Sequence, residues 1–375
     1  MAIDSSRARL KIAIVVPGGV DPSGTERVIP VLLWLLERLT AGGDEVHVFA
    51  LGQQPSPGKW RLCGATIHNA GHRRSRIRAL GDLFRERRRA PFDIVHAFWA
   101  GAPGQVAAVF ALLTGTPMVV TLPGGDIAAL PDIAYGARLR WRGRAATRLV
   151  LATARRIIAP SHFIAAQVEA LGWRAANIPF GVALDRWPPC APRRREGGGP
   201  LRLCHVASLN RVKDQIGLLD ALAMVAADDV DFTLDIVGED TLGGEVQRKC
   251  AALGLDRRIR FHGFLPQPQL RAVVARSDMM IINSRHEGAL IVLLEAAAVG
   301  VPTIGTRVGL IADWSPEAAM SVPVGDLKGL ARAIVELASN EDMRLRLAQA
   351  AHQRAIANDA DDYASRLRSL YAELA

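Results

Sequence analysis

The chain has 375 residues, of which 50% are hydrophobic and 22% are charged. This length indicates two domains, and the apolar content excludes an intrinsically disordered chain. The net charge of +9 is compatible with nucleic-acid binding, but we find no helix-turn-helix, RNP or zinc-finger signature and no aromatic residues interleaved with the basic ones, so we expect no nucleic-acid partner.

Short apolar runs alternate with longer helical patterns along the whole chain, which is typical of parallel sheets built from βαβ units. The runs are rich in β-branched residues and nearly unbroken, as expected of strands that are covered on both faces. In the first half we expect strands at residues 11–17, 45–51, 93–99, 117–123 and 156–161.

Two arginine-rich stretches lie between these strands, Arg73 to Arg89 and Arg138 to Arg156. The first also carries Ile77, Leu80 and Phe84 at helical spacing. Residues 1–185 hold 23 Lys and Arg against 13 Asp and Glu, whereas residues 186–375 hold 23 against 24. Two interpretations stay open: an anionic membrane surface binds these stretches, or they form a solvated, arginine-rich surface.

Residues 187–200 read WPPCAPRRREGGGP and have no periodicity, so we predict a linker at 186–200 between domains at 1–185 and 201–355. In the second domain we expect strands at 201–208, 231–238, 258–264, 278–284 and 301–306, with helices at 215–226 and 245–253. Residues 342–375 read as two successive helices that could close either domain, and the helix at 356–375 could cross back to the first domain. The expected fold class is α/β, with two doubly wound sheets that face each other across a cleft.

The four cysteines form no close pair, which argues against a zinc site or a disulfide framework and fits a reducing compartment; they are Cys63, Cys190, Cys204 and Cys250. Asp4 precedes any apolar run, and Glu295 and Pro302 break the longest apolar stretch. We therefore predict neither a signal peptide nor a membrane-spanning helix. The expectation is a cytoplasmic protein, peripheral on the inner face of the membrane if the arginine stretches bind lipid.

The segment NSRHEGALIVLLEAAAVGVPTIGT, which begins at Asn283, is the most informative part of the sequence. It predicts a strand that ends near Ser284, a turn with Glu287 and a helix over 289–299. The amides of Gly288, Ala289 and Leu290 would then form an anion site suited to a diphosphate. Glu295, eight residues after Glu287, could bind ribose hydroxyls while Glu287 binds a sugar.

This segment resembles the Glu-x7-Glu motif of retaining GT-B glycosyltransferases of carbohydrate-active family four, also called glycosyl transferases group 1. EGALIVLLEAAAVGVPTI keeps the spacing, both glutamates and the Gly-Val-Pro of that motif. Further stretches that begin at residues 24, 93, 177, 206 and 236 resemble other landmarks of the family in the same order. The resemblance covers nearly the whole chain and implies an acceptor domain followed by a nucleotide-sugar domain.

The resemblance also implies roles for single residues. Glu295 would hold the ribose, Glu287 the donor sugar, and the amides of Gly288 to Leu290 the phosphates. Lys213 would neutralise the leaving diphosphate, and Gly24 would let its loop approach the donor. Asp126 completes the predicted catalytic set of Glu287, Asp126 and Lys213, and no metal or other cofactor is then required.

Two positions depart from the family pattern. Ser208 stands where an arginine is common, and Arg211 is close enough in sequence to substitute for it. Pro123 stands where a histidine that contacts the donor sugar is common, although Asp126 in the same loop is retained.

The sequence therefore predicts a retaining glycosyltransferase that moves a sugar from a nucleotide-diphosphate sugar to a lipid, saccharide or small-molecule acceptor. One alternative is a sugar-nucleotide epimerase or a phosphorylase on the same fold. Pro123 motivates another, a nucleotide-sugar-binding protein without turnover. Neither the nucleotide, the sugar nor the acceptor can be named from the sequence, because specificity depends on loop shape.

Overall fold

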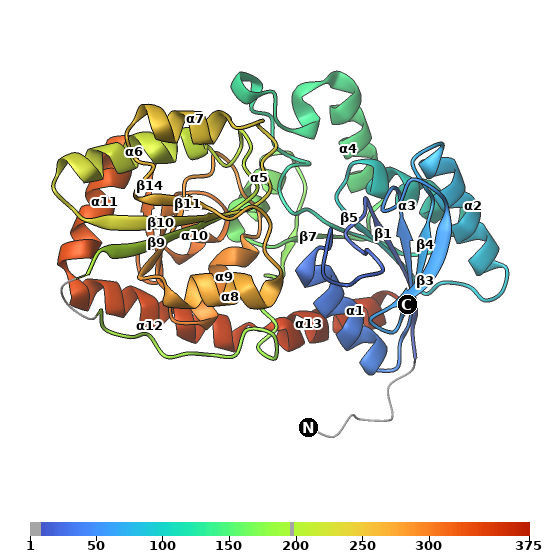
Figure 1. Cartoon of the computed structure of the whole chain (residues 1–375). Coiled ribbons are helices and arrows are strands. Elements are labelled where there is room, and N and C mark those ends of the chain that lie inside the picture. Colours follow the sequence, from blue (N-terminus) through green and yellow to red (C-terminus); the bar gives the residue numbers. More distant parts are fainter. Residues whose placement is uncertain (1–8, 196–198) are drawn as a thin grey trace. The chain divides into compact units, whose positions relative to one another are not determined.

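The computed structural model describes residues 9–195 and 199–375, which form two compact units (Figure 1). Unit 1 contains the chain up to Phe180 together with Ala360–Ala375, and unit 2 contains Gly181–Asp359. Asp4 and residues 196–198 of the predicted linker lie outside the described residues. Unit 1 thus ends before residue 185, and the last helix belongs to it.

Unit 1 is built on a sheet whose described strands have the order β3-β4-β2-β1-β5-β6-β7-β8. All neighbouring pairs are parallel except β3 with β4. The strands are β1 (Lys11–Val16), β2 (Glu45–Ala50), β3 (Gly58–Leu62), β4 (Ala65–Asn69), β5 (Ile94–Phe98), β6 (Met118–Thr121), β7 (Arg156–Ala159) and β8 (Ala176–Asn177). The helices are α1 (Pro30–Ala41), α2 (Ser75–Arg87), α3 (Ala102–Thr114), α4 (Trp141–Thr153), α5 (His162–Glu169) and α13 (Ala360–Leu374).

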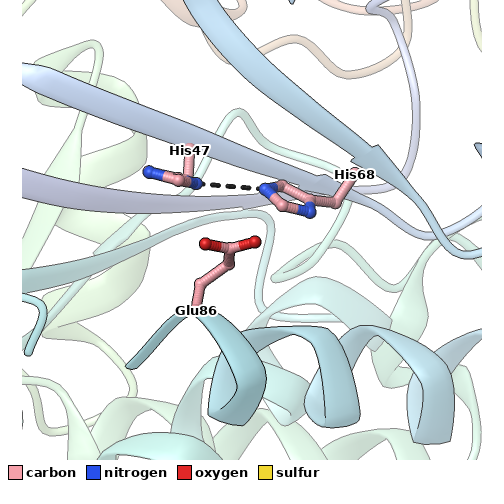
Figure 2. Close-up of side chains that lie close together, drawn as sticks. All are labelled: His47, His68 and Glu86. Carbon is pink, nitrogen blue, oxygen red and sulfur yellow. Dashed lines mark hydrogen bonds between the residues drawn. The ribbon is translucent and has the colours of Figure 1, made fainter. Parts of the chain in front are cut away.

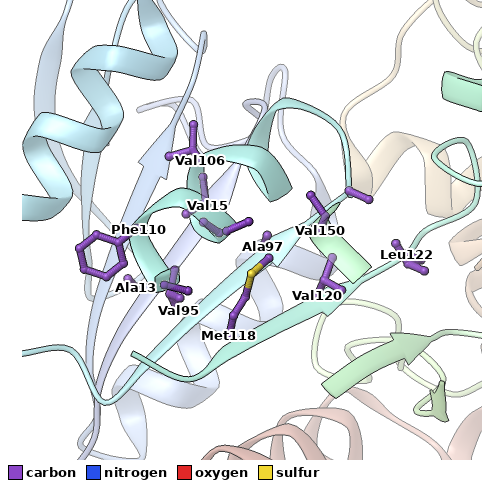
Figure 3. Packing of buried hydrophobic residues seen from close by; sticks show 14 of the residues in the cluster. Ala13, Val15, Val95, Ala97, Val106, Phe110, Met118, Val120, Leu122 and Val150 are labelled. Atoms are coloured by element: carbon purple, nitrogen blue, oxygen red, sulfur yellow. The ribbon is translucent and has the colours of Figure 1, made fainter. Parts of the chain in front are cut away.

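The core of unit 1 explains the unbroken apolar strands of the sequence. Side chains from β1, β5 and β6 pack against Val106 and Phe110 of α3 and Val150 of α4 (Figure 3). Successive side chains of a strand point to opposite faces of the sheet, so Ile12 and Ile14 lie on the face opposite to that of Ala13 and Val15. Residues on both faces of β1 are buried. A strand covered on both faces cannot alternate apolar and polar residues.

Helix α13 is fixed to unit 1 by polar contacts as well as by packing. Arg368 donates to both oxygens of the buried Asp44, at 2.9 and 3.2 Å. The hydroxyl of Tyr371 lies 2.5 Å from Nδ1 of His96, which is fully buried on β5. Residues from the end of the chain therefore complete the core of the first unit.

Unit 2 contains a parallel sheet whose described strands have the order β11-β10-β9-β12-β13-β14. The strands are β9 (Leu201–Val206), β10 (Phe232–Val237), β11 (Ile259–Phe261), β12 (Met279–Ile282), β13 (Thr303–Thr306) and β14 (Met320–Val322). The helices are α6 (Gln215–Ala227), α7 (Glu245–Ala252), α8 (Gln267–Arg276), α9 (Ile291–Ala298), α10 (Gly309–Trp314), α11 (Leu327–Ser339) and α12 (Glu341–Ala357). The predicted fold class, α/β with two Rossmann-like parallel sheets, is confirmed.

The described part of the predicted linker is not a free tether. Trp187 is fully buried in unit 2, and the Cys190 N–H donates to the Ala298 carbonyl at 3.0 Å. Arg193 and Arg195 lie at 3.5 and 3.6 Å from the buried Asp278 carboxylate. Trp187 and these polar contacts therefore fix the segment to unit 2, although most of its other described residues are exposed.

None of the helices in the described ranges combines the length and apolar character needed to cross a bilayer.

Candidate active site

The predicted donor residues of unit 2 follow the two central strands of its sheet. The strand order reverses between β9 and β12, which pair in parallel, so the connections from these strands leave in opposite directions. A crevice forms outside the carboxyl ends of strands at such a switch point, and ligands of doubly wound sheets bind there. Hydrogen bonds join the loops that follow β9 and β12, among them those from Arg285 N to Val212 O (2.7 Å) and from Asn283 Nδ2 to Asp214 O (3.0 Å).

These joined loops bring Lys213 and Glu287 into an ion pair, although 74 residues separate them in sequence. The same carboxylate oxygen of Glu287 accepts a hydrogen bond from the Ser284 hydroxyl at 2.5 Å. The side chains of Lys213 and Glu287 are 24% and 12% exposed, so the pair is only partly shielded from solvent. Two of the three predicted catalytic residues therefore form a charged pair beside the switch point.

Residues at the end of β13 and in the loop after it pack against the turn that carries Glu287. Gly309 has a φ of 52°, and a Cβ there would lie 2.9 Å from the Gly288 carbonyl oxygen and 3.1 Å from Glu287 Cβ. The Thr306 hydroxyl donates to the Ser284 carbonyl at 2.5 Å. Any side chain at position 309 would therefore displace the turn that carries Glu287.

The helix after this turn begins two residues later than the sequence predicts. Leu290 has a left-handed φ of 46° and precedes α9, which starts at Ile291. The helix predicted to start at about Ala289 thus begins after the left-handed backbone of Leu290. Among the described residues, Gly288, Ala289 and Leu290 donate no backbone hydrogen bond to another residue. Their N–H groups can serve an anion as loop amides.

Glu295 lies on α9 and is 2% exposed, in contrast to Glu287. The side-chain amide of Gln267, on α8, links Glu295 to Trp187. Its Nε2 donates to the Glu295 carboxylate at 3.2 Å, and its Oε1 accepts from Trp187 Nε1 at 2.6 Å. Burial raises the pKa of Glu295 to about 7. The two glutamates of the motif thus have different electrostatic surroundings.

In unit 1 the predicted residue Asp126 lies in the loop after β6. It is 5% exposed, and its Oδ1 accepts from the Gly101 N–H at 3.2 Å in the loop after β5. Its Oδ2 is buried and accepts no hydrogen bond from the described residues. Burial raises the pKa of Asp126 to about 7. This carboxyl group has only backbone donors, so its ionised form is costly.

Gly24, the other predicted residue of unit 1, lies in the loop after β1. Its φ is 68°, and its N–H donates to the Asp21 carbonyl at 3.0 Å. Gln53 and Gln54 donate to the Asp21 carboxylate, which holds this loop beside the end of β2. The turn needs a residue that adopts positive φ without strain.

Comparison with known families identifies the chain. Residues 192–354 match the family "Glycosyl transferases group 1", and residues 28–181 match the "Glycosyl transferase 4-like domain". The chain belongs to the group 1 glycosyltransferases. The first match contains Lys213, Glu287 and Glu295, and the second contains Asp126 but not Gly24.

Curated relatives of this glycosyltransferase include the glycogen synthase of Mycobacterium tuberculosis, 28% identical over 345 residues that cover 90% of this chain and 80% of the relative. A phosphatidyl-myo-inositol mannosyltransferase of Mycobacterium leprae is 28% identical over 392 residues, which cover 98% and 97% of the two chains. These relatives support glycosyl transfer as the enzymatic activity and differ in what their names say they act on.

Solved structures share the GT-B fold of this glycosyltransferase. Sucrose-phosphate synthase from Thermosynechococcus elongatus superposes with a TM-score of 0.83 at 18% identity, covering 97% of this chain and 99% of that one. Anabaena Alr3699/HepE, solved in complex with UDP-glucose, gives a TM-score of 0.74 at 18% identity and covers 97% and 100%. At this identity the likeness concerns the fold alone.

The two remaining predicted donor residues of the glycosyltransferase are not part of the charged pair. Arg211 is exposed and forms an ion pair with Glu245 at 3.0 Å. Ser208 is exposed as well, and its carbonyl oxygen accepts from Gln215 Nε2 at 3.2 Å. Arg211 is thus engaged on the surface and does not contact Lys213 or Glu287 in this arrangement.

Sequence reasoning missed the residues that hold the site in place. Gln215 donates to the Ser208 carbonyl and to Nε2 of the buried His205, whose Nδ1 donates to the Ile281 carbonyl at 2.9 Å. This arrangement braces the loop after β9, and burial lowers the pKa of His205 to about 4, so the imidazole is neutral. A histidine inside an apolar strand was a signal for such bracing. No sequence signal marked Gln267 or its link to Trp187.

Within the described residues, one group of at least three histidine, cysteine or acidic side chains is close enough to share a metal ion. It lies in unit 1 and includes none of the predicted site residues.

Proposed function

We propose that this glycosyltransferase moves a sugar from a nucleotide-diphosphate sugar to its acceptor with retention of the anomeric configuration. The donor diphosphate binds the loop amides of Gly288 to Leu290, and the ribose hydroxyls bind Glu295. Glu287 contacts the donor sugar, while Gly24 and Asp126 serve the same reaction from unit 1.

One observation carries the proposal: the ion pair of Lys213 with Glu287 lies beside the sheet's switch point, near amides that have no acceptor among the described residues. A departing nucleoside diphosphate gains negative charge, and a fixed ammonium group lowers the free energy of that charge. Glu287 holds the ammonium in place before the donor arrives. HepE, which has a similar fold, was crystallised with UDP and with UDP-glucose, and this supports a nucleotide sugar as the donor of the present chain.

The reaction needs no carboxylate nucleophile. We infer that the leaving diphosphate takes the proton of the acceptor hydroxyl while Lys213 stabilises its charge. We infer retention from the resemblance of the motif around Glu287 and Glu295 to that of the retaining family.

Donor binding is tested first, by thermal-shift measurement with UDP-, GDP- and ADP-sugars, since a ligand that binds only the folded chain raises the melting temperature. Product analysis with and without acceptors then separates the alternatives. A product formed without acceptor points to an epimerase, and donor binding without any product points to a non-catalytic binding protein. NMR of the glycoside must show the anomeric configuration of the donor, and inversion contradicts the proposal.

A second proposal concerns the surface of unit 1, which we infer docks on an anionic membrane. Helix α3 packs against both α2 and α4, so the three helices form one continuous surface. Four large apolar side chains on it are between 63% and 71% exposed: Ile77, Leu112, Leu113 and Trp141. Leu80 and Phe84 pack against the core instead. Helices α2 and α4 also carry arginines, which suit anionic lipid.

Flotation with liposomes tests this surface. The chain should float with vesicles that contain anionic lipid and not with neutral ones, and the triple variant Leu112→Ser, Leu113→Ser, Trp141→Ser should lose most of that binding. Phe264→Ser removes a comparably exposed aromatic (54%) from unit 2 and should bind normally. Equal binding of the wild type to both kinds of vesicle contradicts the proposal.

A further inference from the structure

Three buried side chains with metal-ligating atoms meet on one face of the unit 1 sheet. His47 lies on β2, His68 on β4 and Glu86 in the last turn of α2 (Figure 2). Their ligand atoms all lie within 4.8 Å of one another, and His47 Nδ1 is 3.0 Å from His68 Nε2. The exposed fractions of the three residues are 7%, 6% and 4%.

The register of the sheet aims both imidazoles the same way. β2 and β4 pair in parallel with Phe49 opposite His68, and His47 is two residues before Phe49, so the three rings share a face. The His68 ring stacks on Phe49 at 4.7 Å and on His47 at 5.3 Å. Helix α2 packs over these strands and brings Glu86 to the same place. The group is therefore held by three elements far apart in sequence.

The outer nitrogen of His47 has the partner expected of a metal-binding histidine. His47 Nε2 lies 3.0 Å from a carboxylate oxygen of Glu45. A proton on Nε2 leaves the Nδ1 lone pair directed toward His68 and Glu86, and such a carboxylate typically orients a ligating histidine.

The charges around the group can accommodate a divalent ion. Glu86 accepts from Lys59 at 3.2 Å and from Arg89 at 3.0 Å, but these side chains are 50% and 65% exposed and can turn into solvent. Lys11 stays in place, because its ammonium donates to the carbonyls of Glu86 and Ala90. Arg9 pairs with Glu45 at 3.2 Å and is 67% exposed, so it can turn into solvent as well. With Arg9, Lys59 and Arg89 turned away, the carboxylates of Glu45 and Glu86 outnumber Lys11.

We propose that His47 Nδ1, His68 Nε2 and a carboxylate oxygen of Glu86 bind one Zn²⁺ ion. Imidazole and carboxylate ligands suit zinc, and a water molecule or the second Glu86 oxygen completes four-coordination. His68 then carries its proton on Nδ1. The ion joins β2, β4 and α2 and stabilises unit 1. It takes no part in glycosyl transfer, so this proposal is independent of the proposed function.

The full-length chain, freed of metal with a chelator, is titrated with Zn²⁺ by calorimetry and with Co²⁺ by visible absorption. We expect one ion per chain, tetrahedral Co²⁺ bands that Zn²⁺ abolishes, and a higher melting temperature with Zn²⁺. His68→Gln should abolish binding, and Glu45→Gln should weaken it about 10- to 100-fold. His72→Gln, which removes an exposed histidine of the same unit, should bind like the wild type.

Two results overturn the proposal. One is a wild-type chain that binds no Zn²⁺ and gives no tetrahedral Co²⁺ spectrum, which needs no variant to fold. The other is a folded His68→Gln variant that binds Zn²⁺ as tightly as the wild type.

Discussion

The loops at the carboxyl ends of the strands carry different kinds of charge in the two units. In unit 2 the loops after β9 and β12 hold an opposed pair, Lys213 and Glu287, which is partly open to solvent. In unit 1 the loops after β5 and β6 hold one buried carboxyl, Asp126, for which the described residues supply backbone donors and no cation. The same topology thus supports a preformed ionic site in one unit and a carboxyl that tends toward its neutral form in the other.

The largest expected effect comes from removing the cation of unit 2. Lys213→Met keeps the length of the side chain but leaves the leaving diphosphate without its ammonium, so kcat should fall about 10²- to 10³-fold. Arg211→Met is the matched control, because Arg211 pairs with Glu245 on the surface. It should change kcat less than about threefold. Steady-state kinetics measures kcat. A similar loss of kcat in both variants would mean that positive charge in this loop matters in general, and not the lysine that pairs with Glu287.

The buried carboxyl of Asp126 should make the free energy of unfolding depend on pH. The pKa of Asp126 is raised from 3.8 to about 7, so the folded wild type loses stability as pH rises from 4 to 7. Asp126→Asn lacks this loss, and its stability relative to the wild type should grow over that range by on the order of 3 kcal/mol. Thermal unfolding at pH 4, 6 and 8 measures the change. If the difference in stability between Asp126→Asn and the wild type does not vary with pH, the Asp126 carboxyl does not have the raised pKa expected of a buried group.

The next effect distinguishes the two glutamates of unit 2. Glu295 has a pKa of about 7 in the free chain, and its ionised form accepts ribose hydroxyls more strongly. Donor affinity should therefore rise about tenfold between pH 6 and pH 8. Glu295→Gln should bind donor weakly and with no such dependence, as measured by calorimetry at each pH. If donor affinity of the variant still rises between pH 6 and pH 8, a group other than Glu295 causes the dependence on pH.

The smallest effect tests the support behind Glu295. Trp187→Phe removes the hydrogen bond to Gln267, so the amide that faces Glu295 is held less firmly. We expect donor affinity to fall about two- to fivefold. Trp60→Phe is the matched control in unit 1, where the Trp60 N–H donates to the Val20 carbonyl. An equal loss in both variants would assign the effect to general destabilisation.

The central strands were predictable from the sequence, as was the edge strand β11, whereas β3, β4, β8 and β14 toward the other edges were not. β1 and β12 read as strands because burial on both faces requires consecutive apolar residues. β3 carries exposed polar residues at a sheet edge, and β4 contains His68 and Asn69, whose burial depends on partners elsewhere in unit 1. Asn69, for example, accepts from the backbone of Gln53 at 3.0 Å. Polar residues of this kind carry no strand pattern.

By itself the sequence determined the alternation of strands and helices, the resemblance to the group 1 glycosyltransferases and the spacing of Glu287 and Glu295. Local periodicity and motif spacing suffice for these, because they depend on neighbours within a few turns or strands. Only the tertiary structure decided that Lys213 meets Glu287, that Arg211 turns to Glu245, and that Gln267 faces Glu295. Each of these contacts joins residues dozens of positions apart, and sheet topology, not sequence pattern, determines which loops become neighbours.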